Sequence, residues 1–230
     1  MNYSKNCPKS LIDSLSKSKR GDNVFIVGGG PSVLQYLPDY SILFNQDVIA
    51  VNNSYRIFPN AILCHFADKI WYGWHTDPKF GYNIHENFHN PVTTADYNNN
   101  SVHWKPYKHI AAVFKRAGAN GSNVKIGLAK ENYEVGGNNG GQHAINIAYH
   151  IGYKNVILLG FDLRQDLHST HWHNEHHRPV NKLNYSHTII PSFEQLGKDV
   201  DEIDDFNVIN TNYESALKCF PYGKLEDYLI

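Results

Sequence analysis

Six short apolar runs, rich in β-branched residues, constrain the fold of this chain more than any other feature. They lie at residues 23–27, 47–51, 61–66, 109–114, 155–160 and 206–210. Each has the length of a β-strand, and several are apolar throughout, as expected for parallel strands covered on both faces. Residues 140–151 place Ala144, Ile147, Ala148 and Ile151 on one helical face, and that helix leads directly into the fifth run. The sequence therefore predicts an α/β fold, most simply a Rossmann-like, doubly wound and mainly parallel sheet with right-handed crossovers.

The length of 230 residues, 41% of them hydrophobic, favours a single domain over residues 1–230. We expect residues 1–21 to form a short polar N-terminal extension. Residues of about 72–108 are rich in aromatic, histidine and asparagine side chains without clear periodicity, which predicts an irregular insert or lid beside the site. The end of the chain predicts a strand, a polar turn and then an apolar helix, which Ser215 is expected to cap.

Charge and cysteine usage narrow the class of protein. Lys and Arg number 21 against 22 Asp and Glu, so a net charge of −1 gives no general attraction to nucleic acid or anionic lipid. The cysteines Cys7, Cys64 and Cys219 lie far apart and fit a reducing compartment. No apolar run near the N-terminus is long enough for a signal peptide or a membrane span. We expect a cytoplasmic protein, and homo-oligomerisation stays open.

A glycine triplet follows the first predicted strand in "VFIVGGGPSV", which places Gly28, Gly29, Gly30, Pro31 and Ser32 before a predicted helix. In open α/β sheets such a turn lets the backbone approach a phosphate at the helix N-terminus. A sharp turn without a ligand is the alternative.

Two well-known nucleotide motifs do not fit this turn. Val33 stands where the dinucleotide fingerprint has its last glycine, and Asn52 and Asn53 end the second strand in place of a ribose-binding carboxylate. No Gly-Lys-Ser/Thr follows, which excludes a Walker A loop. The two asparagine amides are candidate contacts to a base, ribose or phosphate, or they turn the chain. Asp68, after the third run, is expected either to orient a substrate or to cap a helix.

A second glycine-rich stretch, "EVGGNNGGQHA", opens the helix at residues 140–151 and offers further backbone N–H donors. Two such loops in one α/β domain favour an extended phosphorylated ligand.

These motifs, in order, resemble those of a known superfamily. "VFIVGGGPSV", "DVIAVNNSY", "GGNNGGQHAINIAYHIGYKNVILLGFD", "SHT" and "VINTNYESALKCFP" are similar to the superfamily that contains the family-42 sialyltransferases and the DUF115/MptE-like proteins. The phage-encoded branch of the second group looks most similar in the "HWHNEHH" region. The resemblance covers most of residues 23–229 and leaves out the insert.

The resemblance implies a transferase with a nucleotide-binding Rossmann-like sheet. It implies a cytidine nucleotide held by Gly28, Gly30, Pro31, Ser32 and Asn52, with Gly140 and Gly141 facing the donor. We add Gly29, Asn53 and Asp162 as candidate nucleotide-binding residues. The MptE-like branch implies instead the transfer of diphosphate from ATP, which would require Mg²⁺.

Five histidines fall within ten positions of the loop after the predicted strand at 155–160. They are His168, His171, His173, His176 and His177. His171, His173 and His177 are candidate ligands for zinc or another divalent metal, with Asp162 or Glu175 as an oxygen ligand, although the spacing matches no fixed motif. The interpretation that we favour uses His171 and His173 to neutralise phosphate charge and protonate a leaving group. A solvated surface loop is the third interpretation.

His187, in "NYSHTI", is the closest match to the general base of the sialyltransferases, and the resemblance implies that role for it. A packed or surface histidine is the alternative.

The sequence thus predicts a nucleotide-dependent transferase, most concretely a sialyltransferase-like glycosyltransferase that moves a sugar from a CMP-type donor to a hydroxyl acceptor. The first alternative is an ATP-dependent diphosphokinase. The second is a non-catalytic phage binding or assembly protein on a nucleotide-binding scaffold.

Overall fold

A seven-stranded, all-parallel sheet forms the centre of the molecule, with the strand order β5-β4-β3-β2-β1-β6-β7. The computed structural model describes residues 7–36, 39–96, 109–118, 125–131, 133–164, 168–174 and 185–229. The strands are β1 (Asn23–Val27), β2 (Val48–Val51), β3 (Leu63–Phe66), β4 (Val92–Asp96), β5 (Ile110–Lys115), β6 (Asn155–Leu159) and β7 (Asn207–Asn210). The predicted α/β fold with a doubly wound parallel sheet is confirmed.

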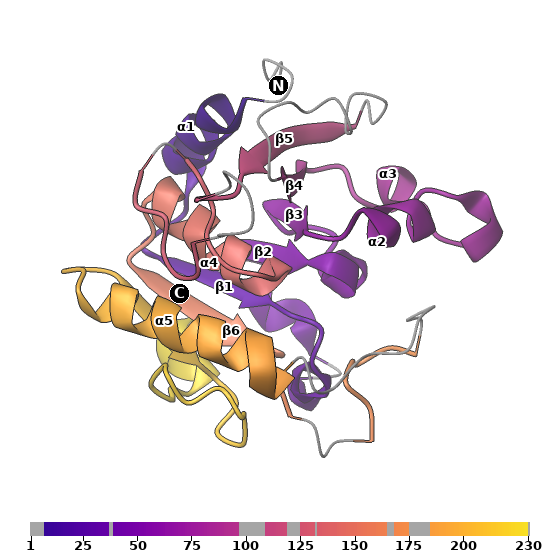
Figure 1. The fold of residues 1–230 in the computed structure, drawn as a ribbon. Coiled ribbons are helices and arrows are strands. Elements are labelled where there is room, and N and C mark those ends of the chain that lie inside the picture. The colour runs from indigo at the N-terminus through magenta and orange to yellow at the C-terminus, as the bar shows by residue number, and fades with distance from the viewer. Residues whose placement is uncertain are drawn as a thin grey trace.

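Helices cover both faces of the sheet. Figure 1 shows α1 (Pro8–Ser18), α4 (Gly140–Ile151) and α5 (Ile190–Asp201) along one side. The other face is covered by shorter elements: η1 (Pro31–Tyr36), η2 (Tyr40–Leu43), η3 (Asn52–Arg56), α2 (Lys69–Trp74), η4 (Pro78–Phe80) and α3 (Ile84–Asn87). In β1, Val24 and Ile26 join the core under α1 and α4, whereas Phe25 and Val27 join the core on the opposite face. This alternation explains why the strand is apolar throughout.

Three segments differ from the sequence-based expectations. The polar extension contains α1, whose Leu11, Ile12 and Leu15 are buried in the core. The expected irregular insert supplies β4, which lies between β3 and β5, while residues 97–108 lie outside the described residues. The chain after β7 forms turns and the short η7 (Leu225–Tyr228), and no α-helix lies among the described residues there.

The helix α4 begins and ends as predicted. The Asn139 side chain accepts a hydrogen bond from the Gln142 N–H, and Gly152 ends the helix in the left-handed conformation with φ of 91°. His143 stands outside the apolar stripe of Ala144, Ile147, Ala148 and Ile151, yet it is buried because α4 packs over β1, β2 and β3.

The strand order creates a topological switch point between β1 and β6. The chain proceeds from β1 outward to β5, and then returns to β6 and β7 on the other side of β1. The connections that leave β1 and β6 therefore diverge, and ligands of open α/β sheets bind in the crevice at such a point. Within the described part of the chain, no helix has the length and apolar character needed to cross a membrane.

Candidate functional site

A cavity of about 150 Å³ lies at this switch point. Its walls come from the turn after β1, the end of β2, the start of α4 and the end of β6, together with the histidine loop and η6 (Tyr185–Ile189). Most of the residues predicted to bind a nucleotide line it, namely Gly28, Gly29, Gly30, Asn52, Gly140, Gly141 and Asp162. The structure therefore brings together segments separated by more than a hundred residues.

The three glycines of the first turn have different roles. The N–H groups of Gly28 and Gly30 donate to the carbonyl groups of Leu159 and Gly160, each at 2.8 Å. A Cβ on Gly28 would lie 2.8 Å from the Gly160 oxygen, and one on Gly30 would lie 2.6 Å from the same atom and overlap the Asp162 carboxylate. Gly28 and Gly30 are thus needed for the close packing of β1 against the end of β6.

Gly29 is the glycine of the triplet that faces the histidine loop. A Cβ there would meet only the His171 ring, with Cδ2 at 2.9 Å. Across the cavity lie Gly140 and Gly141 in the first turn of α4, where backbone N–H groups have no acceptor within the helix. These groups carry the positive end of the helix dipole and favour an anion such as phosphate.

The two asparagines after β2 also differ. Asn52 adopts the left-handed conformation with φ of 53°, and its buried Oδ1 has no hydrogen-bond partner among the described residues. Asn53 Oδ1 accepts a hydrogen bond of 2.6 Å from the indole N–H of Trp71, and its amide nitrogen lies 3.4 Å from His173 Nδ1. Asn52 therefore lines the cavity with its Oδ1 buried and unsatisfied, whereas the Asn53 side chain contacts α2 and the histidine loop.

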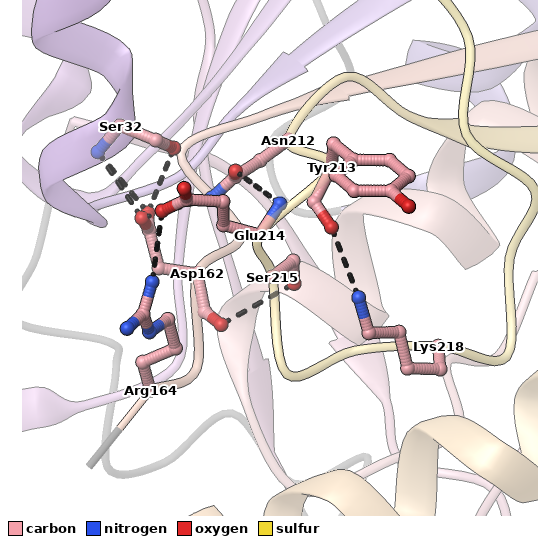
Figure 2. A network of polar contacts seen from close by, with 8 residues as sticks. All are labelled: Ser32, Asp162, Arg164, Asn212, Tyr213, Glu214, Ser215 and Lys218. Atoms are coloured by element: carbon pink, nitrogen blue, oxygen red, sulfur yellow. Dashed lines mark hydrogen bonds and ion pairs between the residues drawn. The ribbon is translucent and has the colours of Figure 1, made fainter. Parts of the chain in front are cut away.

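Asp162 joins three loops at the edge of the cavity (Figure 2). Its carboxylate accepts hydrogen bonds from the Ser32 hydroxyl at 2.8 Å, from the Ser32 N–H at 3.3 Å and from the Asn212 amide at 3.0 Å. Burial raises the pKa of the Asp162 carboxyl, and the hydrogen bonds from Ser32 oppose that shift. Pro31 and Ser32 do not line the first cavity but line a second one on the far side of Asp162.

Within the described part of the histidine loop, His171 is the histidine that lines the cavity. Its Nδ1 lies 2.9 Å from the Thr170 hydroxyl oxygen, and its ring is 5.3 Å from that of His173. His173 is turned toward Asn53 and is absent from the lining.

The described residues contain no cluster of three side chains that could hold a metal ion. The candidate ligands His177 and Glu175, as well as His176, lie outside the described residues. The structure thus places His171, His173 and Asp162 of the predicted metal set.

His187 lies on η6 and is exposed, between Tyr185 and Ile189, both of which line the cavity. Burial raises the pKa of the Tyr185 hydroxyl, and a hydrogen bond with Thr170 opposes that shift. Asp68 caps α2 by accepting a hydrogen bond from the Ile70 N–H at 2.8 Å, in agreement with the capping alternative.

Sequence reasoning missed several lining residues. They are Val51, Asn139, Gly160, Phe161, Leu163, Thr170, Tyr185, Ile189 and Phe193. Asn139 carried a signal, because an asparagine directly before a predicted helix is a favoured N-cap. The position of Tyr185 depends on the path of a loop, for which the local sequence gives no periodic signal.

A buried pair of histidines lies between α4, which carries His143, and β3, which carries His65. His65 Nε2 is 3.2 Å from His143 Nδ1, His65 Nδ1 is 3.0 Å from the Thr93 hydroxyl, and His143 Nε2 is 3.3 Å from the Gly137 carbonyl oxygen. One consistent arrangement is a directed chain in which Thr93 donates to His65, His65 to His143, and His143 to Gly137. Both imidazoles are then neutral, in agreement with the lowered pKa of each, which burial causes.

The fold is similar to that of a solved protein. The structure described as the MAf glycosyltransferase from Magnetospirillum magneticum AMB-1 matches with a TM-score of 0.56 and 13% sequence identity, over 100% of this chain and 40% of that one. This chain therefore spans less than half the length of that protein, and the likeness shows a shared fold. No protein-family model matches the sequence, and no curated protein matches it.

Proposed function

We propose that this chain is a nucleotide-dependent glycosyltransferase that binds a nucleotide-activated sugar at the switch point and transfers the sugar to a hydroxyl acceptor. The observation that carries the proposal is the buried, unpartnered Oδ1 of Asn52 in the cavity wall beside the first turn of α4, where a Cβ on Gly140 would lie 3.9 Å from it. A ligand that interacts with both has a hydrogen-bond donor close to an anionic group, as a nucleotide does.

The donor phosphate is proposed to lie between Gly29 and the first turn of α4. The His171 ring, which lies over Gly29, then faces the phosphate oxygen that leaves with the nucleotide. An imidazole there can donate a proton or a hydrogen bond to that oxygen. A CMP-type donor is favoured by the resemblance to the sialyltransferases, and sugar transfer by the glycosyltransferase name of the structural relative.

The transfer step needs a base for the acceptor. The acceptor oxygen forms a bond to the anomeric carbon while the bond from that carbon to the phosphate oxygen breaks, and the electron pair leaves with the nucleotide. The hydroxyl proton is proposed to pass to Asp162, because its carboxylate lines both cavities and its pKa is raised by burial. His187, the base that the resemblance implies, is exposed and lines neither cavity.

Turnover of two variants separates these bases. Asp162→Asn should lower kcat by about 10²-fold or more, while His187→Ala should leave kcat within about threefold of the wild type. The opposite ranking would return the role of the base to His187.

Thermal unfolding with a panel of CMP, UMP, ADP, and ATP with Mg²⁺ tests the proposal directly. CMP at 100 times its dissociation constant should stabilise the protein by about 2.7 kcal/mol. Stabilisation by ATP with Mg²⁺ alone would favour the diphosphokinase, with the ion held by Asp162 and the phosphates. If no nucleotide shifts the unfolding temperature, the transferase proposal is wrong, and a binding or assembly protein is the remaining alternative.

A further inference from the structure

A second cavity, of about 480 Å³, borders the first one at Asp162. It lies beyond the carboxyl end of β7 and is lined by side chains from η1, from the start of the loop after β6 and from the turn after β7. Of these lining residues, only Pro31, Ser32 and Asp162 are among the candidate nucleotide-binding residues. Its size is that of a small-molecule site.

Two exposed tyrosines form one side of this cavity. The side chains of Tyr213 and Tyr222 are 73% and 51% exposed, and their rings meet edge to face with the centroids 5.4 Å apart. Large exposed aromatic side chains have an apolar surface that favours burial against a ligand. The two rings, inclined at 81° to each other, therefore form an angled platform, on which one ring can stack against the flat, apolar face of a ligand while the other contacts its edge.

The turn that carries Tyr213 is held in place before any ligand binds. Figure 2 shows Lys218 donating to the Tyr213 carbonyl oxygen, at 2.9 Å, and Ser215 donating to the main-chain oxygen of Asp162, at 3.3 Å. The Lys218 ammonium also lies 5.6 Å from the centre of the Tyr213 ring. A preorganised site loses less entropy when a ligand binds.

The charged side chains that line this cavity are one arginine and two carboxylates. Arg164 forms an ion pair with Glu214 at 3.0 Å, and Asp162 adds a second carboxylate. Gln35 and Asn212 contribute amides that both donate and accept hydrogen bonds. This lining disfavours a phosphate, which would meet two carboxylates, and suits a neutral ligand with many hydroxyl groups and one apolar face.

We propose that this second cavity binds the pyranose ring of a carbohydrate, which packs into the angle between Tyr213 and Tyr222, stacks on one of the two rings and hydrogen-bonds to the surrounding amides. We assign this cavity as the acceptor subsite of the proposed glycosyltransferase. That assignment rests on the proposed function, in which Asp162 lies between the acceptor and the nucleotide-activated donor. The carbohydrate site itself stands on the geometry of the cavity alone.

Saturation-transfer NMR with the full chain tests the site. The probes are methyl glycosides of galactose, glucose and N-acetylglucosamine, with cytidine, which has no pyranose ring, as the control. At least one glycoside should bind, and Tyr213→Ala with Tyr222→Ala should weaken it by about tenfold or more, the factor that corresponds to about 1.4 kcal/mol. Replacing both tyrosines with Phe should preserve binding, because stacking does not need the hydroxyl groups. Phe44→Ala, at a 51% exposed aromatic side chain outside this cavity, is the matched control and should have no effect.

CMP binding measured on the same samples separates this inference from the proposed function. If CMP binds equally to all variants and no glycoside binds to the wild type, the carbohydrate site is wrong and the nucleotide site stands. If a glycoside binds through the tyrosines and no nucleotide binds, the site stands without its acceptor role. Undiminished glycoside binding after both tyrosines are replaced by Ala, or cytidine binding at the tyrosines instead, would overturn the inference.

Discussion

The Asp162 carboxylate lies 2.8 Å from the Ser32 hydroxyl oxygen, and this hydrogen bond joins the end of β6 to the turn after β1. Both segments border the switch point, so this hydrogen bond is part of the wall between the two cavities. A hydrogen bond to a buried carboxylate is stronger than one between neutral groups.

Removing the Ser32 hydroxyl should therefore destabilise the fold. Ser32→Ala should lower the free energy of unfolding by about 2 kcal/mol, measured by urea denaturation. Ser41→Ala is the matched control, because Ser41 pairs with Asp39 at an exposed position and should cost less than about 0.5 kcal/mol. Equal effects of the two substitutions would show that the Asp162 contact has no special role.

Substitutions of the adjacent Asn52 and Asn53 should affect different properties, nucleotide binding in the first case and stability in the second. Asn52→Gly keeps the left-handed backbone and removes the unpartnered Oδ1, so it should weaken nucleotide binding by about tenfold while leaving stability within about 0.5 kcal/mol. Asn53→Ala leaves the buried Trp71 indole N–H without an acceptor and should cost about 1–3 kcal/mol of stability. Calorimetric titration and urea denaturation of both variants check this contrast, and a loss of stability in Asn52→Gly would contradict it.

The glycine triplet gives a second matched comparison. Gly30→Ala places a Cβ against the Gly160 oxygen and the Asp162 carboxylate, so it should strongly destabilise the protein or prevent folding. Gly29→Ala meets only the movable ring of His171, so the protein should fold but bind nucleotide more weakly. Soluble yield and circular dichroism measure the first effect, and nucleotide titration measures the second. A Gly30→Ala protein as stable as the wild type would disprove the proposed packing.

The buried pair of His65 and His143 should make the fold sensitive to acid. Burial lowers the pKa of His143 to about 3 and that of His65 well below its usual value, whereas both bind protons near pH 6.5 when the chain is unfolded. Their stabilising contribution is therefore present above pH 6.5 and is lost as the pH falls below it. Between pH 7.5 and 5, His143 alone should remove roughly 2 kcal/mol from the free energy of unfolding, and His65 should add to that loss.

Replacing both histidines with Gln should make this pH dependence shallower. A residual slope should remain, because burial also lowers the pKa of His85 and of His150. Urea denaturation at several pH values measures both slopes. An unchanged slope in the double variant would contradict the neutral, buried pair.

The sequence predicts the sheet well because burial on both faces requires long apolar runs. β4 is an exception, because its sequence "VTTAD" buries the polar side chains of Thr93 and Thr94. The side chain that contacts the Thr93 hydroxyl is His65 rather than an apolar residue. The sequence predicts a polar extension in place of α1 because Leu11, Ile12 and Leu15 are the only apolar side chains of an otherwise polar segment. One such stripe is enough to bury a helix.

The site was predictable only in part. The glycine turn and Asn52 follow strands, so the topology fixes their place at the sheet edge. Contacts with Gly160 and Asp162 decide which glycine of the triplet has room around it. A contact with Trp71 decides which of the two asparagines already has a hydrogen-bond partner. Such contacts between distant segments leave no local pattern in the sequence.

The most direct test of the central claim is a chemical-shift titration of the ¹⁵N-labelled protein with CMP. Binding at the switch point predicts the largest changes at the N–H groups of Gly29, Gly140 and Gly141 and at the side-chain amide of Asn52, with Asn52→Gly weakening the response. The absence of any change with CMP or the other nucleotides, or changes confined to residues outside this cavity, would contradict a nucleotide site at the switch point.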